Sequence, residues 1–326
     1  MVRDRLRSPQ RHLRPGHHRT RHVRRPRYPY AADRSTFLIE TDEATWRRAG
    51  FDASTDRTAP QDSDEVSLQY LQDAFAETLQ HHRLIGNRTK WMRFRTVGCT
   101  RWHSGNVVLL GDAAHTAHYS IGSGTKLAME DAIALDHALT SAANLDDALT
   151  EYERIRRPAV EHLQQIAHRS ELWWESFPQR MDLPVDQLMI AYMTRAGKVG
   201  LDRFAESAPT VVSQGLASYA SRPAGTVSPT DITDWILAQP LAHHGADFAT
   251  RIAPADLRDA PTTAKLDVVS TAAWDAEADT VVDNAPQAEI LWLTGPDSRV
   301  AVLNRLDLAE RLLRATSATV VVEAPE

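Results

Sequence analysis

The chain has 326 residues, of which 42% are hydrophobic and 25% charged, and its formal net charge is −6. These values are typical of a folded protein, and the negative charge argues against nucleic acid or an anionic membrane as the main partner. Cys99 is the single cysteine, so no internal disulfide can form, and the sequence shows no signal peptide or transmembrane pattern. We therefore expect a cytoplasmic protein with no membrane partner and no nucleic acid partner.

The first 27 residues consist mainly of Arg, His and Pro, with Asp4 as the single acid. So few apolar residues cannot offset the entropy lost on ordering, and we predict a disordered basic leader over residues 1–27. A nucleic-acid arm would interleave aromatic residues with the arginines, and a transit peptide would carry more serine. We favour a leader that is not native sequence, because recognisable sequence begins abruptly at Tyr28.

The next segment alternates strand and helix signals. Tyr28–Trp46 predicts a strand, a turn, a second strand and a helix that opens at Thr41-Asp42-Glu43. Ser67–Leu79 predicts an amphipathic helix with Leu68, Leu71, Phe75 and Leu79 on one face. In Asn87–Gly105, basic and aromatic residues alternate, which predicts half-buried strands with their basic side chains outward.

The stretch from Asn106 to Leu139 organises the chain. Val107–Leu110 reads as a buried strand, Gly111-Asp112 breaks it, and a small-residue loop holds Gly122 and Gly124 before a helix that starts at about Thr125. The glycines allow backbone to approach a ligand closely, and the helix start offers unpaired N–H groups and a positive dipole end. This corner therefore suits a ligand that is anionic or becomes so.

Helices dominate the sequence after this stretch. Asn144 is expected to cap a helix from Leu145, and Pro158 to break it or to open a new helix, which continues through Glu161–Trp174. Asp186–Arg203 predicts one more helix. We expect residues 206–264 to be a linker with short helices, and residues 265–326 to form a small α/β tail with a parallel β-α-β unit.

The sequence VVLLGDAAHTAHYSIGSGTKLAMEDA resembles the second flavin-binding motif of the single-component FAD-dependent aromatic hydroxylases, which have the p-hydroxybenzoate hydroxylase-like fold. STFLIETDEATW and EYERIRRPAVEHL also resemble segments of that family. Many relatives have prolines after the motif histidine and Asn where Lys126 stands, whereas this loop reads His118-Tyr119-Ser120. The difference indicates the branch that hydroxylates aromatic CoA thioesters, salicylyl-CoA 5-hydroxylase and 2-aminobenzoyl-CoA monooxygenase.

The resemblance implies FAD as the cofactor and NAD(P)H as the electron donor. It implies that Asp112, after Gly111, hydrogen-bonds the ribityl chain, and that Gly122 belongs to the loop around the flavin. The N–H groups that would face the pyrimidine edge of the isoalloxazine come from Gly124, Thr125, Lys126 and Leu127. A helix start aimed at that edge would favour the negatively charged reduced flavin.

The resemblance also implies the reaction, which is hydroxylation of an aromatic substrate, and more specifically of an aromatic acyl-CoA, with NAD(P)H and O2. Lys90, Arg93 and Arg95 are candidates for the phosphates of a CoA thioester as a cluster, whereas a solvated sheet face is favoured for each one taken singly. His118 and Tyr119 are candidates for contact with the aromatic substrate. The sequence is compatible with an oligomer.

The fold implied is α/β (α+β), namely the distal part of the p-hydroxybenzoate hydroxylase-like fold without its N-terminal Rossmann unit. The sequence contains no G-x-G-x-x-G loop and no Asp-Gly dipeptide. We expect a partial FAD-binding domain over residues 28–205, with the substrate sheet in 28–105 and the flavin motif and helices in 106–205. We also expect an exposed apolar face on the strand and helix of the motif, and weak or absent FAD binding by this chain alone.

Two other functions remain as alternatives. Asp112, His115 and His118 could be ligands of a metal-dependent hydrolase, although no second ligand cluster is evident. The chain could also be an inactive or incomplete fragment of a monooxygenase, which the absent pyrophosphate loop supports. No Gly-x-Ser-x-Gly elbow is present, so a serine hydrolase is not indicated.

Overall fold

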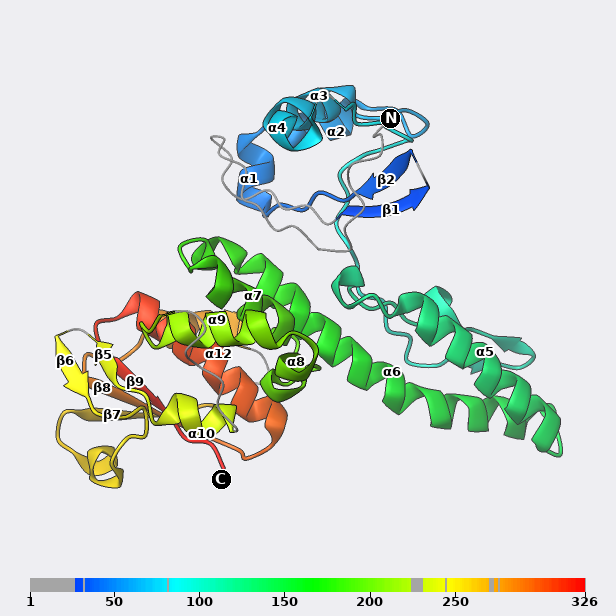
Figure 1. Cartoon of the computed structure of the whole chain (residues 1–326). Helices are drawn as coiled ribbons and strands as arrows, with labels where there is room; N and C mark the ends of the chain where they lie inside the picture. Colours follow the sequence, from blue (N-terminus) through cyan, green and yellow to red (C-terminus); the bar gives the residue numbers. More distant parts are fainter. Residues whose placement is uncertain are drawn as a thin grey trace. The chain divides into compact units, whose positions relative to one another are not determined.

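The computed structural model describes residues 27–325, except residues 32, 81, 224–230, 244, 270–272 and 275. Apart from Arg27, the predicted leader therefore lies outside the described residues. The chain folds as two compact units, one ending at Leu183 and the other starting at Pro184, and each is described by itself (Figure 1).

The first unit begins with a hairpin and short helices (Figure 1). Strands β1 (Arg27–Ala31) and β2 (Arg34–Phe37) pair antiparallel, and α1 (Glu43–Arg48) follows. Asp42 caps α1 by accepting a 2.9 Å hydrogen bond from the Thr45 N–H, which confirms the predicted helix start. Three more helices complete the group: α2 (Phe51–Arg57), α3 (Glu65–Ala74) and α4 (Ala76–Leu79).

The predicted amphipathic helix Ser67–Leu79 is present, but it is divided at Phe75 into α3 and α4. Its apolar face is confirmed, since three of the four residues assigned to that face are buried, and Phe51 of α2 joins them. The buried members are Leu71, Phe75 and Leu79. This core holds the hairpin against the helices through an edge-on contact of Phe37 with Phe75, whose ring centroids lie 5.5 Å apart.

The prediction of strands through Asn87–Gly105 was wrong for most of that segment. The ladder there is limited to β3 (His103–Ser104), paired with β4 (Val107–Val108), and one bridge from Gly98 to His115. The side chains of this segment do not complete a sheet: the Trp91 ring stacks 4.9 Å from Phe51 of α2, whereas Met92 and Phe94 are exposed. The buried strand expected over Val107–Leu110 was also wrong, because β4 has two residues and the Val107 side chain is 61% exposed.

Two long helices form the rest of the first unit. The motif loop contains the 3-10 turns η1 (Gly111–Ala113) and η2 (Tyr119–Ile121), and α5 (Gly124–Ser141) follows. Helix α6 (Leu145–Glu175) packs against α5, and the 3-10 turn η3 (Phe177–Arg180) comes after it. Their shared core includes Trp102, Leu127, Tyr152 and Val160.

The cap predicted at Asn144 is confirmed, since its side chain accepts a 2.9 Å hydrogen bond from the Asp147 N–H. The break predicted at Pro158 was wrong, because α6 runs through that residue. Proline removes one helix hydrogen bond, and here buried residues on both sides of it, Tyr152 and Val160, keep the helix packed. The exposed apolar surface predicted for the motif is confirmed: Met129 and Ile133, one turn apart on α5, are 62% and 70% exposed.

The second unit starts with helices. α7 (Val185–Thr194) and α8 (Leu201–Ser207) replace the single helix predicted over Asp186–Arg203, and Gly197 between them has a left-handed φ of +67°. Both pack against α9 (Pro209–Tyr219), and α10 (Ile232–Leu237) joins the same core. The compact units therefore divide after Leu183, whereas the sequence suggested a boundary after residue 205. The short helices expected in residues 206–264 are present as α9 and α10.

A three-stranded parallel sheet completes the second unit (Figure 1). A small hairpin of β5 (Leu241–His243) and β6 (Ala246–Phe248) and the 3-10 turn η4 (Ala255–Asp259) precede the sheet. The sheet order is β7 (Thr263–Asp267), β8 (Ile290–Thr294) and β9 (Thr319–Val322), with α11 (Ala276–Asp283) and α12 (Arg299–Ala315) between consecutive strands. β8, α12 and β9 confirm the predicted parallel β-α-β tail, and β7 adds a strand to it. Across the described part of the chain, no helix combines the length and apolarity that a membrane span requires.

Candidate functional site

The turn after β4 is held closely against α5. Gly111 has a left-handed φ of +57°, and a Cβ placed there would lie 3.1 Å from the Cβ of Ala128. The Gly111 N–H donates a 2.9 Å hydrogen bond to Oδ2 of Asp131, which is on α5. The backbone can therefore approach the helix only with glycine at this position, while the neighbouring Asp112 is exposed to solvent.

A buried ion cluster fixes this turn. Asp131 is fully buried; its Oδ2 lies 2.7 Å from His115 Nε2, and its Oδ1 accepts a 2.8 Å bond from Arg156 Nε on α6. Burial raises the pKa of Asp131, but hydrogen bonds from His115, Arg156 and the Gly111 N–H together hold it below its ordinary value. The carboxylate thus joins the motif turn, α5 and α6 in one network.

This cluster was not predicted from the sequence. Its members are 16 and 25 residues apart in sequence, so no local spacing connects them. Of the residues of the proposed metal site, His115 lies within hydrogen-bond distance of Asp131, and Asp112 is exposed. In the described ranges, no three His, Cys, Asp or Glu side chains are grouped as metal ligands would be.

The backbone of the motif loop and of the start of α5 is exposed at its glycines. Gly122 has a φ of +64°, and neither Gly122 nor Gly124 has any atom within 4 Å of the position that a Cβ would take. Gly124, Thr125 and Lys126 are exposed and form the first turn of α5, where N–H groups have no acceptor within the helix. Ser123 makes no capping hydrogen bond with its side chain.

Leu127 and the Lys126 side chain make their contacts within α5 and its core. The Leu127 N–H donates to Ser123 O at 3.0 Å, and its side chain is buried in the core of α5 and α6. Lys126 Nζ lies 2.8 Å from Oε1 of Glu130, one turn further along α5. The groups that face outward at the helix start are therefore the backbone of Gly124, Thr125 and Lys126.

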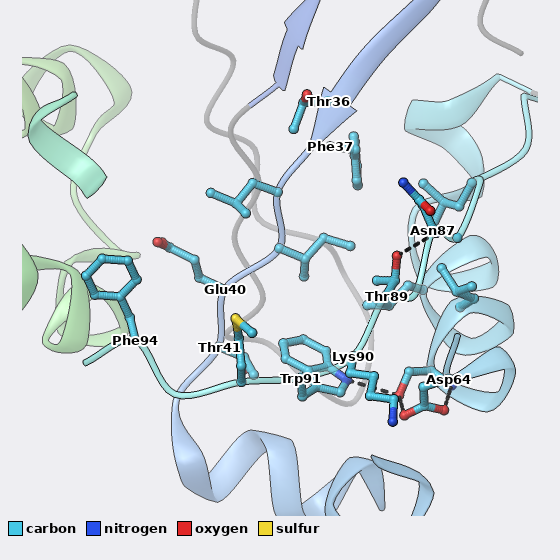
Figure 2. Close-up of a pocket in the computed structure, with 18 of the residues that line it drawn as sticks. Thr36, Phe37, Glu40, Thr41, Asp64, Asn87, Thr89, Lys90, Trp91 and Phe94 are labelled. Atoms are coloured by element: carbon cyan, nitrogen blue, oxygen red, sulfur yellow. Dashed lines mark hydrogen bonds between the residues drawn. The ribbon is translucent and has the colours of Figure 1, made fainter. Parts of the chain in front are cut away.

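The first unit contains a pocket of about 1560 Å³ (Figure 2). It is lined by β2 and the segment after it, by the extended segment around Lys90, by the motif loop and by the end of α6. Figure 2 shows Phe37, Trp91 and Phe94 among the lining side chains, with Lys90 on the same extended segment as Trp91. The aromatic side chains give the pocket an apolar lining suited to a flat ring.

The pocket brings together four of the five predicted substrate residues: Lys90, Arg93, His118 and Tyr119 line it, and Arg95 does not. Both cations have local partners, since Lys90 Nζ donates to Thr58 O at 2.6 Å and Arg93 Nη2 lies 3.0 Å from Glu43 Oε1. A hydrogen bond from Arg47 and the charge of Arg93 lower the pKa of Glu43.

Asp64 is a buried carboxylate on the pocket wall, and it was not predicted as a site residue from the sequence. It caps α3, and its Oδ2 accepts hydrogen bonds from Ser54 Oγ at 2.7 Å and from Ser67 Oγ at 2.8 Å. Burial raises the pKa of Asp64, and the hydrogen bonds from Ser67, Ser54 and Thr55 more than offset that effect. A saturated carboxylate of this kind indicates a structural role in shaping the pocket.

Comparison with known proteins finds a family match for part of the first unit. Residues 30–167 match the family model described as FAD binding domain. Relatives include the salicyloyl-CoA 5-hydroxylase of Streptomyces sp, 46% identical over 173 residues that cover 52% of this chain and 33% of the relative. The 3-hydroxy-4-methyl-anthranilyl-[aryl-carrier protein] 5-monooxygenase of Streptosporangium sibiricum is 44% identical over 172 residues, which cover 53% of this chain and 42% of the relative.

A solved structure of PqsL from P. aeruginosa superposes on 49% of this chain and on 43% of its own, with 26% identity and a TM-score of 0.36. Residues 30–167 are thus the part of this chain that matches an FAD binding domain, and the two curated relatives are named as a hydroxylase and a monooxygenase. The chain spans between a third and about two-fifths of the length of the two curated relatives. The resemblance and the partial α/β FAD-binding fold inferred from the sequence are confirmed.

Proposed function

We propose that this chain belongs to an FAD-dependent monooxygenase that hydroxylates the ring of an aromatic acyl thioester with NAD(P)H and O2. The observation that carries the proposal is the open start of α5 behind Gly122 and Gly124, placed within the match to an FAD binding domain. The names of the relatives support an aromatic acyl group, a salicyloyl thioester of CoA in one and an anthranilyl group on a carrier protein in the other. FAD, when bound, would accept the hydride and activate O2.

The residues at the motif fit the isoalloxazine half of FAD. A Cβ at Gly122 or Gly124 would project into open space, which leaves room for a flat ring to approach the backbone. We assign the N–H groups of Gly124, Thr125 and Lys126 to the pyrimidine edge, because a helix start favours the negative charge that develops there on reduction. We assign the exposed Asp112, held in place by Gly111, to the ribityl chain, and Leu127 to anchoring the helix.

The pocket that Trp91 and Phe94 line is the proposed substrate site. Its aromatic side chains would hold and orient the ring and would exclude water from it. Lys90 and Arg93 are placed at the wall, but their cationic groups already contact Thr58 and Glu43. We therefore place the phosphates of a CoA carrier outside the pocket, toward the exposed Arg95, and the acyl group inside.

The substrate proposal is tested by titrating the purified chain with S-(2-aminobenzoyl)-N-acetylcysteamine, a fluorescent aromatic thioester without phosphates. We expect saturable binding with quenching of tryptophan fluorescence, because Trp91 lines the pocket. Trp91→Leu should reduce the quenching, and the remainder would come from Trp46 and Trp174, which line the same pocket. Trp235→Leu in the second unit should leave the quenching unchanged. Absence of saturable binding to the unaltered chain would contradict the proposed substrate site.

A further prediction concerns FAD. The sequence has no G-x-G-x-x-G loop, so the pyrophosphate and adenosine of FAD have no identified cradle in this chain. We expect the purified chain to be colourless and to bind added FAD weakly through its isoalloxazine half. The absorbance of flavin in the purified protein measures this, and yellow protein with stoichiometric FAD would contradict it.

A further inference from the structure

Helix α5 exposes a narrow stripe of four residues along one side. Lys126, Met129, Ile133 and Asp136 are all exposed, and they follow one another at spacings of three, four and three residues. Met129 and Ile133 are 62% and 70% exposed although both are apolar. This spacing brings the four side chains onto one line of the helix, as in the seam between two paired helices. We call these four residues the α5 stripe.

Other side chains of α5 hold the helix in the first unit. Leu127, Asp131 and Ala138 are buried, and Asp131 belongs to the ion cluster that joins α5 to α6. Glu130 is directed to α6 as well, since Arg156 Nη2 lies 3.2 Å from its Oε2. The α5 stripe is therefore separate from these contacts, and a partner can cover it without disturbing them.

The order of residues in the α5 stripe makes it complementary to its own reversed copy. The basic Lys126 comes first, the apolar Met129 and Ile133 follow, and the acidic Asp136 comes last. When two copies pair antiparallel about a twofold axis, the register that sets Met129 opposite Ile133 also sets Lys126 opposite Asp136. Each layer of the seam then joins two apolar side chains or two opposite charges.

Parallel pairing of the same stripe lacks this complementarity. It would set Lys126 opposite Lys126 and Asp136 opposite Asp136, and both contacts are repulsive. The small, exposed Ala132 lies near the twofold axis of the antiparallel pair, where it lets the two helices approach closely. The charges and the side-chain sizes therefore both favour the antiparallel arrangement.

The contact that Lys126 makes within its own chain is compatible with this pairing. Lys126 Nζ lies 2.8 Å from Oε1 of Glu130, and the Lys126 side chain is 71% exposed. An exposed ion pair of this kind contributes little stability, and an ammonium group has three hydrogens to donate. Lys126 can therefore keep Glu130 and also meet the carboxylate of Asp136 from a second copy.

We propose that the α5 stripe is a dimer interface and that its partner is a second copy of this chain, paired antiparallel. The proposal does not depend on the flavin and substrate roles assigned above. Lys126 and Asp136 are separated by roughly 15 Å along the helix, at a rise of about 1.5 Å per residue. The starts of the two α5 helices therefore lie at opposite ends of the seam.

Sedimentation velocity of the unaltered full chain tests the interface. A single pair of helices is a small interface, so we expect a dissociation constant on the order of 10–100 µM, with monomers at about 1 µM and mostly dimers at about 300 µM. Ile133→Glu should weaken the association by roughly tenfold or more, because a carboxylate would be buried opposite Met129. Val185→Glu, at an exposed valine of the second unit, should leave the association unchanged.

An exchange of charges tests the antiparallel register. Lys126→Glu and Asp136→Lys each set two like charges opposite each other, and each should weaken the association by about threefold to tenfold. The double variant with both changes sets opposite charges together again, so it should associate as the unaltered chain does. A parallel seam or an interface elsewhere on the chain gives no such recovery.

Three results would overturn the proposal. A monomer at every concentration would show that the α5 stripe is not covered by a second copy, and would leave it to a different protein segment. Association that persists in Ile133→Glu would place the interface elsewhere. Failure of the double variant to recover would exclude the antiparallel register. If Ile133→Glu lowers the melting temperature, the decision passes to the charge exchange, whose variants change only exposed polar residues.

Discussion

Asp131→Asn is expected to destabilise the first unit by about 3–5 kcal/mol, the usual cost of removing one partner from a buried ion pair. Asp131 is fully buried and accepts from His115, from Arg156 and from the Gly111 N–H. An asparagine can accept at one atom only, so the variant would leave at least one of these donors facing an NH₂ group. Urea unfolding followed by tryptophan fluorescence measures the loss, since Trp102 lies 5.0 Å from the His115 ring.

Asp136→Asn provides the matched control for this variant. Asp136 is on the same helix but is exposed, so its replacement should change the free energy of unfolding by less than about 0.5 kcal/mol. Equal stability of the two variants would contradict the role assigned to the ion cluster.

The same cluster predicts how stability depends on pH. The pKa of Asp131 is lower in the folded chain than its ordinary value of about 3.9. A group with a depressed folded pKa contributes its full stability above the unfolded pKa, and that contribution is lost as pH falls through the folded pKa. Acid unfolding of the unaltered chain should therefore steepen below about pH 4, and this component should be absent in Asp131→Asn.

Gly124→Val is expected to abolish the interaction with FAD without unfolding the protein. A Cβ at Gly124 would meet no atom within 4 Å, and the backbone there is not left-handed, so the valine is accommodated with little strain in the structure itself. Its branched side chain would instead occupy the space in front of the first turn of α5, where we place the isoalloxazine. We expect FAD affinity to fall by at least about a hundredfold, since overlap of this kind excludes the ring. An FAD titration followed by amide chemical shifts measures it.

Gly98→Val is the control for this change. A Cβ at Gly98 also meets no atom within 4 Å, but this glycine is outside the motif loop. The control should keep the FAD affinity of the unaltered chain and the same melting temperature as Gly124→Val. A Gly124→Val chain that binds FAD normally would show that the ring does not approach this turn.

The sequence correctly predicted those elements that are determined by residues close together in the chain, such as helix caps and apolar runs. Asp42 and Asn144 carry cap signals, and both cap helices as expected. The strands and helix of the tail, β8, α12 and β9, also followed from apolar runs and helical spacing. In each case the residues that decide the structure are neighbours in the chain.

The failures have a common physical cause in tertiary packing. Around Trp91, the alternation of basic and aromatic residues predicted a strand, but the Trp91 ring packs on Phe51 of a helix and the residues after it are exposed. At Pro158, the burial of Tyr152 and Val160 outweighed the cost of one missing helix hydrogen bond. Sequence spacing contains neither kind of information.

The candidate site was predictable in its backbone and not in its supporting side chains. The order of Gly111, Gly122 and Gly124 indicated a turn and a helix start, and the structure has both. The network around Asp131 joins residues 16 and 25 positions apart, which a single sequence does not connect. The flavin and substrate roles of the motif residues themselves stay predictions.

The central claim is that the first turn of α5 faces the isoalloxazine of FAD, and an NMR titration of the unaltered chain with FAD tests it most directly. We expect fast-exchange shifts of backbone amides that are largest at Gly122, Gly124, Thr125 and Lys126 and are reproduced by riboflavin, which lacks the adenosine half. Shifts that spare these four amides, or that appear with ADP but not with riboflavin, would contradict it.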